Sequence, residues 1–261
     1  MGIAIPQVIT PSKASGAQII DGSLKFDGSK SNRLTRTFGS AGNRTSWTWS
    51  CWTKRDLLTL SNRQVIFGGY SASNNTDWLE IGWDNSADHV YWTSNGVTSD
   101  GTAQRRDPAS WYHFFSTYDG SNLRIYVNNR LDLDYSVTGN MGINVAGAHY
   151  IGQSPKNAED RHLDGRLSQC YFIDGQVLNP SDFAFTDPLT NTWKPKKYTG
   201  TFTGTNTFYL PFDGNSPIGK DQSGNGNDWT PVNFGGSVEL DSPQVSGARP
   251  ILNTTQGGTQ A

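Results

Sequence analysis

Residues 111–135 read "WYHFFSTYDGSNLRIYVNNRLDLDY" and contain three runs in which apolar and polar side chains alternate. A period of two places alternate side chains on opposite faces of a β-strand. An Asp-Gly pair at 119–120 and an Asn-Asn pair at 128–129 separate the runs, and these residue types favour tight turns. The stretch therefore predicts three antiparallel strands joined by two hairpin turns.

The same alternation recurs along most of the chain. It appears in "SWTWSCW" (46–52), "DWLEIGWD" (77–84), "HVYWT" (89–93), "HYIGQ" (149–153) and "GRLSQCYFIDG" (165–175). In the first of these, Trp47, Trp49 and Cys51 share one face. A helical turn is indicated only at "NPSDFAF", with Asn179 or Ser181 as its cap, and "DPLTNTWKPKKYTG" (187–200) predicts a surface crossover. The pattern predicts an all-β, antiparallel two-sheet sandwich in a single domain.

The composition agrees with many short strands and tight turns. The 261 residues include 29 Gly, 12 Pro and 9 Trp, with 34% hydrophobic and 17% charged residues. The net charge of -2 and the pI near 6.1 give no attraction towards nucleic acid or an anionic membrane. We expect no membrane span, because no apolar run reaches 18 residues, and no secretory signal, because Pro6 interrupts a start that lacks basic residues.

The two ends differ from the middle of the chain. We expect residues 1–21 to form an extended arm, residues 22–235 the sandwich, and residues 236–261 a polar C-terminal arm. Four apolar side chains near the start are the predicted anchor to a partner: Ile3, Ile5, Val8 and Ile9. Cys51 and Cys170 lie inside predicted strands, so we interpret both as small buried hydrophobic residues rather than a disulfide.

Several segments resemble a known family. "SLKFDGSKSNRLTR" (23–36), "SWTWSCWTKR" (46–55), "LRIYVNNR" (123–130) and "DGRLSQCYFIDG" (164–175) are similar to landmarks of laminin-G-like, concanavalin-A-like jelly-roll sandwiches. More narrowly, "SGAQIIDGSLKFDG", "FIDGQVLNP", "WKPKKYTG" and "SGNGNDW" resemble virion structural proteins of tailed bacteriophages, notably cyanophage-like ones. The resemblance covers roughly residues 14–258. It implies a virion protein that assembles in the bacterial host cytoplasm.

The stretch "FYLPFDGNSPIGKDQSGNGNDW" at 208–229 is similar to the segment that opens many domains of this family, yet it comes late here. Only 32 residues follow Trp229, which is too few for a second sandwich. We interpret it as a permuted order in which the usual opening strand closes the fold. A truncated second repeat is the alternative.

Calcium is a potential ligand, because laminin-G-like folds often hold it with carboxylates from separate loops. The candidates are Asp84, Asp88, Asp119 and Asp221. Asp221 opens "DQSGNGN", which imitates the first half of a calcium loop, but the twelfth position is Val232 rather than a bidentate Glu. The loop is therefore also consistent with a turn that needs Asn and Gly for left-handed backbone.

Three functions follow from the resemblance. The favoured one is a non-catalytic, multi-copy virion structural protein that contacts other virion proteins. The lack of heptads or fibre repeats favours capsid decoration or cement over a tail or fibre. The alternative is an adhesin that binds host polysaccharide through Trp78, Tyr91 and Trp92, although strand tryptophans more often belong to a core. The least favoured is a glycoside hydrolase using Glu80 and Asp84, which lacks the family's central carboxylate.

Overall fold

A computed structural model describes residues 17–58, 61–71, 77–156, 161–235, 238–239 and 242–243 of the protein. The predicted anchor side chains at positions 3, 5, 8 and 9 lie outside these ranges. Among the described residues the only helices are η1 (Gly28–Lys30) and η2 (Pro180–Asp182), and neither has the length or hydrophobicity to cross a membrane. The predicted helical turn after Asn179 is thus confirmed as η2, where the Asp182 carboxylate accepts a hydrogen bond from the Asn179 N–H.

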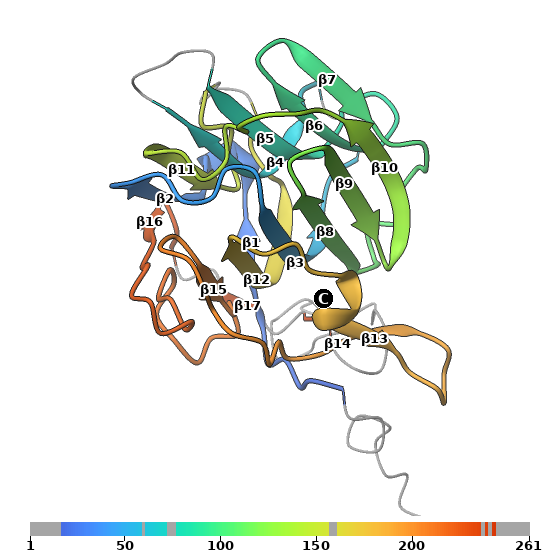
Figure 1. Cartoon of the computed structure of the whole chain (residues 1–261). Helices are drawn as coiled ribbons and strands as arrows, with labels where there is room; N and C mark the ends of the chain where they lie inside the picture. The colour runs from blue at the N-terminus through green and yellow to red at the C-terminus, as the bar shows by residue number, and fades with distance from the viewer. Residues whose placement is uncertain are drawn as a thin grey trace, which may run out of the picture.

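Two antiparallel sheets pack face to face, which confirms the predicted sandwich (Figure 1). Sheet A runs in the order β10 (Arg130–Ser136), β9 (Asn122–Val127), β8 (Tyr112–Tyr118), β3 (Trp47–Arg55), β12 (Gly165–Asp174), β1 (Ser23–Phe26) and β17 (Val238–Glu239), and β15 (Phe208–Leu210) also pairs with β12. Sheet B runs in the order β16 (Thr230–Val232), β2 (Arg33–Phe38), β11 (Gly147–Ile151), β4 (Gln64–Tyr70), β5 (Trp78–Trp83), β6 (Val90–Ser94) and β7 (Val97–Asp100). A separate hairpin consists of β13 (Ala184–Thr186) and β14 (Trp193–Pro195).

The core lies between the two sheets and is rich in aromatic side chains. Trp47, Trp49 and Cys51 of β3 all point into it, as their alternation predicts. The Trp49 ring stacks on Phe67 of β4 with the ring centroids 4.4 Å apart. This contact joins sheet A to sheet B at the centre of the sandwich.

The turn between β9 and β10 shows why the sequence uses two asparagines there. Asn128 and Asn129 both have positive φ, 48° and 66°, and Val127 pairs directly with Arg130. Two central residues with positive φ define a type I′ turn, whose twist matches that of the flanking strands. Asn tolerates this backbone better than most side chains.

The late stretch at 208–229, together with β16 directly after it, completes both sheets of the same sandwich. β12 pairs with β1 through Gly165–Leu167 and with β15 through Cys170–Phe172, so the two short strands share one edge of it. β16 then pairs with β2 in sheet B. Phe208 and Trp229 lie in the main core. The stretch therefore closes the one fold and does not begin a second repeat.

The C-terminal boundary of the sandwich extends beyond residue 235. β17, which falls in the predicted polar arm, pairs with β1 through Ser23 and Leu24. The Ser242 hydroxyl donates to the Ile20 carbonyl at 2.7 Å. The two ends of the described chain thus lie side by side at the edge of sheet A.

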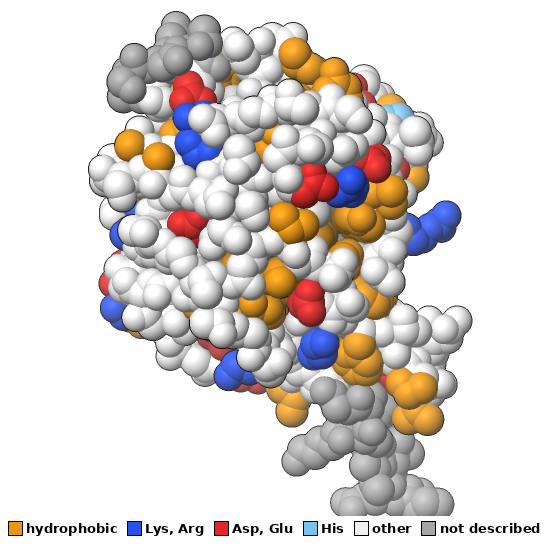
Figure 2. Space-filling view, in the orientation of Figure 1, with side chains coloured by type: hydrophobic (Ala, Val, Ile, Leu, Met, Phe, Trp, Pro, Cys, Tyr) orange, Lys and Arg blue, Asp and Glu red, His pale blue; other side chains and the backbone are white. Residues whose placement is uncertain are grey.

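A long crossover, residues 175–207, covers the outer face of sheet A. It contains η2 and the β13–β14 hairpin, at the lower right of Figure 1. Phe183 and Tyr198 from the crossover pack on Phe115 and Tyr171 of the sheet. Figure 2 shows that this side of the molecule is mostly uncharged, with hydrophobic side chains in small separate groups.

Candidate functional site

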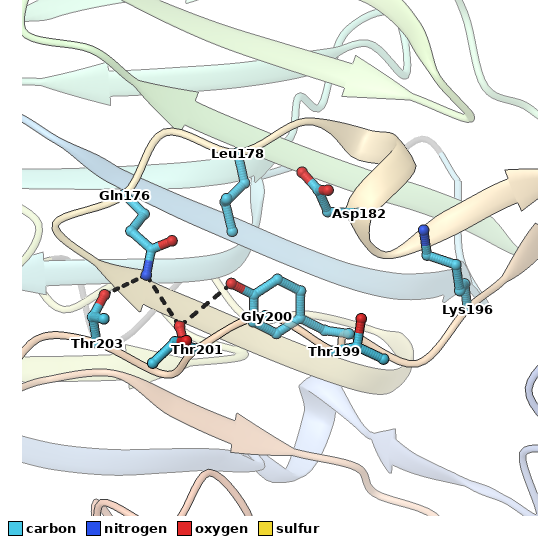
Figure 3. Close-up of a pocket in the computed structure, with 9 residues that line it drawn as sticks. Gln176, Leu178, Asp182, Lys196, Thr199, Gly200, Thr201 and Thr203 are labelled. Carbon is cyan, nitrogen blue, oxygen red and sulfur yellow. Dashed lines mark hydrogen bonds between the residues drawn. The ribbon is translucent and has the colours of Figure 1, made fainter.

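A pocket of about 530 Å³ lies within the crossover and is the candidate functional site. Its volume falls in the range of roughly 300–1,000 Å³ that ligand sites occupy. The lining residues are Gln176, Leu178, Asp182, Lys196, Tyr198, Thr199, Gly200, Thr201 and Thr203. Figure 3 shows Gln176, Thr201 and Thr203 at one end of the pocket and Asp182 and Lys196 at the other.

The buried ring of Tyr198 forms the floor of the pocket. Its ring stacks on Phe183 with centroids 4.9 Å apart and meets Phe202 edge to face at 5.4 Å. The phenol hydroxyl donates to the Thr201 carbonyl at 3.4 Å. Burial, together with the negative charge of Asp182, raises the pKa of Tyr198, so the hydroxyl stays protonated. The ring is thus fixed by packing, and its hydroxyl is held by the Thr201 carbonyl.

The polar groups around this floor offer both donors and acceptors. Gln176 donates through Nε2 to the Thr201 carbonyl at 3.0 Å and to the Thr203 hydroxyl, which leaves its Oε1 as an acceptor. Lys196 donates one of its three N–H groups to the Ser181 carbonyl at 2.7 Å. The arrangement suits a small ligand rich in hydroxyl groups.

The sequence contains a weak signal for this pocket that strand and helix periodicity does not reveal. The segment "YTGTFTGT" at 198–205 repeats Thr at alternate positions, which places several hydroxyls along one stretch of irregular chain. We predicted only a surface crossover there, because the segment has neither the period of a strand nor that of a helix.

Both predicted hydrolase residues are buried: Glu80 on the outer face of sheet B and Asp84 directly after β5. Glu80 has 0% exposure; its carboxylate pairs with Arg161 and accepts from the Tyr91 hydroxyl at 3.3 Å. Asp84 is buried and accepts from the backbone N–H groups of three residues in the turn after β5: Ser86, Ala87 and His89. Neither carboxylate borders an open cleft among the described residues.

The predicted sugar platform does not form. Trp78, Tyr91 and Trp92 are 6%, 0% and 1% exposed. Trp92 points into the main core, on the face opposite Tyr91, because consecutive strand residues point in opposite directions. Lys156 Nζ lies 4.7 Å from the centre of the Trp78 ring, and the Arg63 guanidinium lies 4.8 Å from that of Tyr91. All three rings are therefore covered by other side chains rather than open to a sugar.

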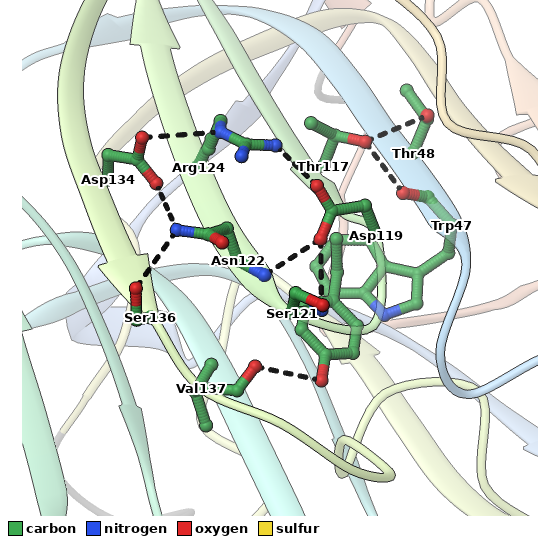
Figure 4. A network of polar contacts seen from close by, with 11 residues as sticks. Trp47, Thr48, Thr117, Asp119, Ser121, Asn122, Arg124, Asp134, Ser136 and Val137 are labelled. Carbon is green, nitrogen blue, oxygen red and sulfur yellow. Dashed lines mark hydrogen bonds and ion pairs between the residues drawn. The ribbon is translucent and has the colours of Figure 1, made fainter.

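The four predicted calcium ligands lie in three places: Asp84 and Asp88 between β5 and β6, Asp119 between β8 and β9, and Asp221 in the loop after β15. Asp88 pairs with Arg55 at 2.9 Å and with Arg106 at 3.1 Å. Asp119 accepts from the N–H groups of Ser121 and Asn122 and pairs with Arg124 at 2.6 Å (Figure 4). Within the ranges that the structure describes, no three acidic, His or Cys side chains gather into a group able to hold a metal ion.

Asp221 organises the late Gly-rich loop as a turn. Its carboxylate accepts from the N–H groups of Tyr209, Ser223 and Asn227 at 2.8–2.9 Å and from the Ser223 hydroxyl. Gly224 and Gly226 have φ values of 91° and 72°, which glycine adopts without strain. These four donors use the carboxylate oxygens that a cation would need. The donor sets of Asp88, Asp119 and Asp221 therefore fit turns and ion pairs better than calcium.

The sequence similarity of this chain to known proteins identifies its family. A model described as the concanavalin A-like lectin/glucanases superfamily matches residues 27–183, more than half of the chain. The chain belongs to this superfamily. The match ends before β15 and β16, which complete its sheets. The fold of this superfamily also occurs in glycoside hydrolases.

One solved structure shows the same fold at low sequence identity, and another is similar to a lesser degree. A candidate carbohydrate-binding protein from Bacteroides ovatus is 17% identical with a TM-score of 0.55, over 87% of this chain and 62% of that protein. The mouse laminin α1 chain, domains LG4-5, is 11% identical with a TM-score of 0.45, over 75% of this chain and 48% of that one. Among curated proteins none matches. These similarities concern the fold alone.

Proposed function

We propose that this protein is a non-catalytic structural component displayed on the surface of a tailed-phage particle, and that it binds carbohydrate through the crossover pocket. The polar pocket floored by Tyr198 carries the binding part of the proposal. Membership of a lectin and glucanase superfamily supports a carbohydrate-binding or structural role.

A non-catalytic role is supported by the burial of Glu80 and its ion pair with Arg161. Glycoside hydrolysis requires two carboxylates on either side of an accessible scissile bond. Glu80 is buried under Arg161 and Asp84 holds a turn, so a polysaccharide cannot reach them in this conformation. The crossover pocket contains a single carboxylate, that of Asp182.

The expected affinity of a single pocket is low. The ring of Tyr198 stacks on Phe183 and meets Phe202 edge to face, so it is largely occupied by protein contacts and binding depends on hydrogen bonds rather than stacking. About four net hydrogen bonds of about 1 kcal/mol each correspond to a dissociation constant on the order of 1 mM. Display of many copies on one particle would raise the effective affinity through multivalency.

The virion setting is supported by the sequence resemblance to tailed-phage structural proteins. The net charge of only -2, with few charged side chains on the face shown in Figure 2, suits close packing beside other virion proteins, because copies repel one another little. We propose capsid decoration ahead of a tail or fibre position, with host-surface glycan as the ligand.

Titration of the whole protein with neutral oligosaccharides, followed by saturation-transfer NMR, tests the binding. We expect signal from sugar protons in the wild type and its loss in a Gln176→Ala, Thr199→Val double variant. Gln104→Ala, in the exposed loop after β7, is the matched control and should bind normally. Unchanged binding in the double variant would place the ligand elsewhere. Hydrolysis of a β-glucan by the wild type that Glu80→Gln abolished would overturn the non-catalytic role.

Cryo-electron microscopy of the particle that carries the chain tests the setting. Density for the sandwich on the capsid lattice agrees with decoration. Density at the tail or a fibre tip would favour the adhesin role, and absence from the particle would refute the virion role.

A further inference from the structure

The crossover pocket has no net formal charge. Of its nine lining residues only Asp182 and Lys196 are charged, so the formal charges of -1 and +1 sum to zero. Figure 3 places both at the same end. Each is half-buried and already has one backbone partner: the Asn179 N–H for Asp182 and the Ser181 carbonyl for Lys196.

No ion pair joins Asp182 and Lys196 within the part of the chain that the structure describes, so each remains available to a ligand. Lys196 keeps two unused N–H donors and the Asp182 carboxylate keeps acceptor capacity. A ligand hydroxyl can donate to the carboxylate and accept from the ammonium. A ligand carboxylate can use only the ammonium, and it brings a like charge towards Asp182.

From this geometry we infer that the pocket selects neutral saccharides and rejects acidic ones, so that Asp182 and Lys196 determine specificity. The inference rests on the proposed function, because it requires that the pocket bind saccharides. An acidic sugar would lose hydration around its charge without a net opposite charge to compensate. A neutral sugar satisfies both side chains and leaves no charge unpaired.

The test compares matched saccharides in the whole protein. The probes are trimers of glucose, galactose and mannose, each paired with the trimer of its uronic acid, and the measurement is the dissociation constant by NMR titration. We expect the neutral member of at least one pair to bind roughly tenfold more tightly than its acid. In the Asp182→Asn variant the positive charge of Lys196 is no longer balanced. The preference of this variant should therefore shift by roughly tenfold towards the acidic trimer.

Two controls keep the result interpretable. Asn at position 182 retains an acceptor for the Asn179 N–H, so η2 should remain folded. Asp134→Asn, on β10 and outside the pocket lining, removes the same charge and should leave the preference unchanged. Wild-type protein that binds neutral and acidic trimers equally, or an Asp182→Asn variant with unchanged preference, would overturn the inference while the proposed function stands. If no trimer of either kind binds, the inference and the carbohydrate-binding part of the proposed function both fail.

Discussion

Two buried histidines should make the sandwich sensitive to mild acid. His113 on β8 accepts a hydrogen bond at Nδ1 from the Trp193 indole at 3.1 Å, so its proton lies on Nε2, 2.8 Å from the Ser50 hydroxyl. His149 on β11 accepts at Nε2 from the Asn144 N–H at 3.1 Å and stacks on Phe38. The pKa of both rings falls from 6.5 to about 3, mainly because of burial. For His149 the hydrogen bond to the Gly147 carbonyl opposes this effect and the nearby charge of Arg36 adds to it.

The direction of the pH effect follows from proton binding. Between pH 6.5 and 3 the unfolded chain protonates both imidazoles while the folded protein keeps them neutral, so acid favours unfolding. At pH 5, each histidine costs about 2 kcal/mol relative to pH 7.5, since the unfolded pKa lies 1.5 units above that pH. The two together remove about 4 kcal/mol, a large part of the 5–15 kcal/mol typical of domain stability.

Urea unfolding at pH 7.5 and pH 5.0 measures this loss. A His113→Gln variant keeps a donor and an acceptor without a titrating ring, so its loss between the two pH values should be about 2 kcal/mol instead of about 4. Burial raises the pKa values of Asp100 and Asp164, so these carboxyl groups stabilise the folded state as the pH falls, opposite to the histidines. Because this contribution is the same in both proteins, the difference between variant and wild type isolates the contribution of His113. A wild-type loss below about 1 kcal/mol, or a His113 C2–H resonance that titrates near pH 6.5 in the folded protein, would refute the reasoning.

Three further predictions concern the packing of the sheets and the loops. Gly68→Ala should cost about 2 kcal/mol in urea unfolding, because the new Cβ would lie 2.8 Å from Pro155, whereas Gly39→Ala meets nothing within 4 Å and should be nearly neutral. Glu80→Gln should lower thermal stability by about 2 kcal/mol, since it removes the partner of partly exposed Arg161; an unchanged melting temperature would contradict the buried pair. Asp221→Ala should cost about 3 kcal/mol and make the loop at 221–227 sensitive to protease, and equal resistance in variant and wild type would show that the carboxylate does not hold the loop.

The sequence was sufficient to predict the strands because alternation reports a sheet with one buried face. Trp47 and Trp49 point inward as their spacing requires, and the Asn-Asn pair forms the expected tight turn. The same rule shows why the predicted sugar platform was wrong. Tyr91 and Trp92 are consecutive in one strand, so they cannot share a face.

The candidate site could not be predicted in the same way. The pocket lies in an irregular crossover, where no periodicity relates Gln176 to Thr203, 27 residues later. The carboxylates proposed as calcium ligands are common turn residues. Only the structure shows that the donors around Asp119 and Asp221 are backbone N–H groups, the Ser223 hydroxyl and Arg124. Composition indicates where polar groups occur but not which atoms face them.

The shared edge of β12 has a consequence for synthesis of the chain on the ribosome. The first half of that edge is filled by β1, which emerges early, and the second half by β15, which emerges after about four fifths of the chain. Phe208 and Trp229 are therefore synthesised after the strands whose core side chains they contact. A nascent chain that stops before them therefore lacks the contacts of Phe208 with Trp49 and of Trp229 with Phe67. The aromatic core stays incomplete, and open to association with other chains or with chaperones, until the last fifth of the chain has been synthesised.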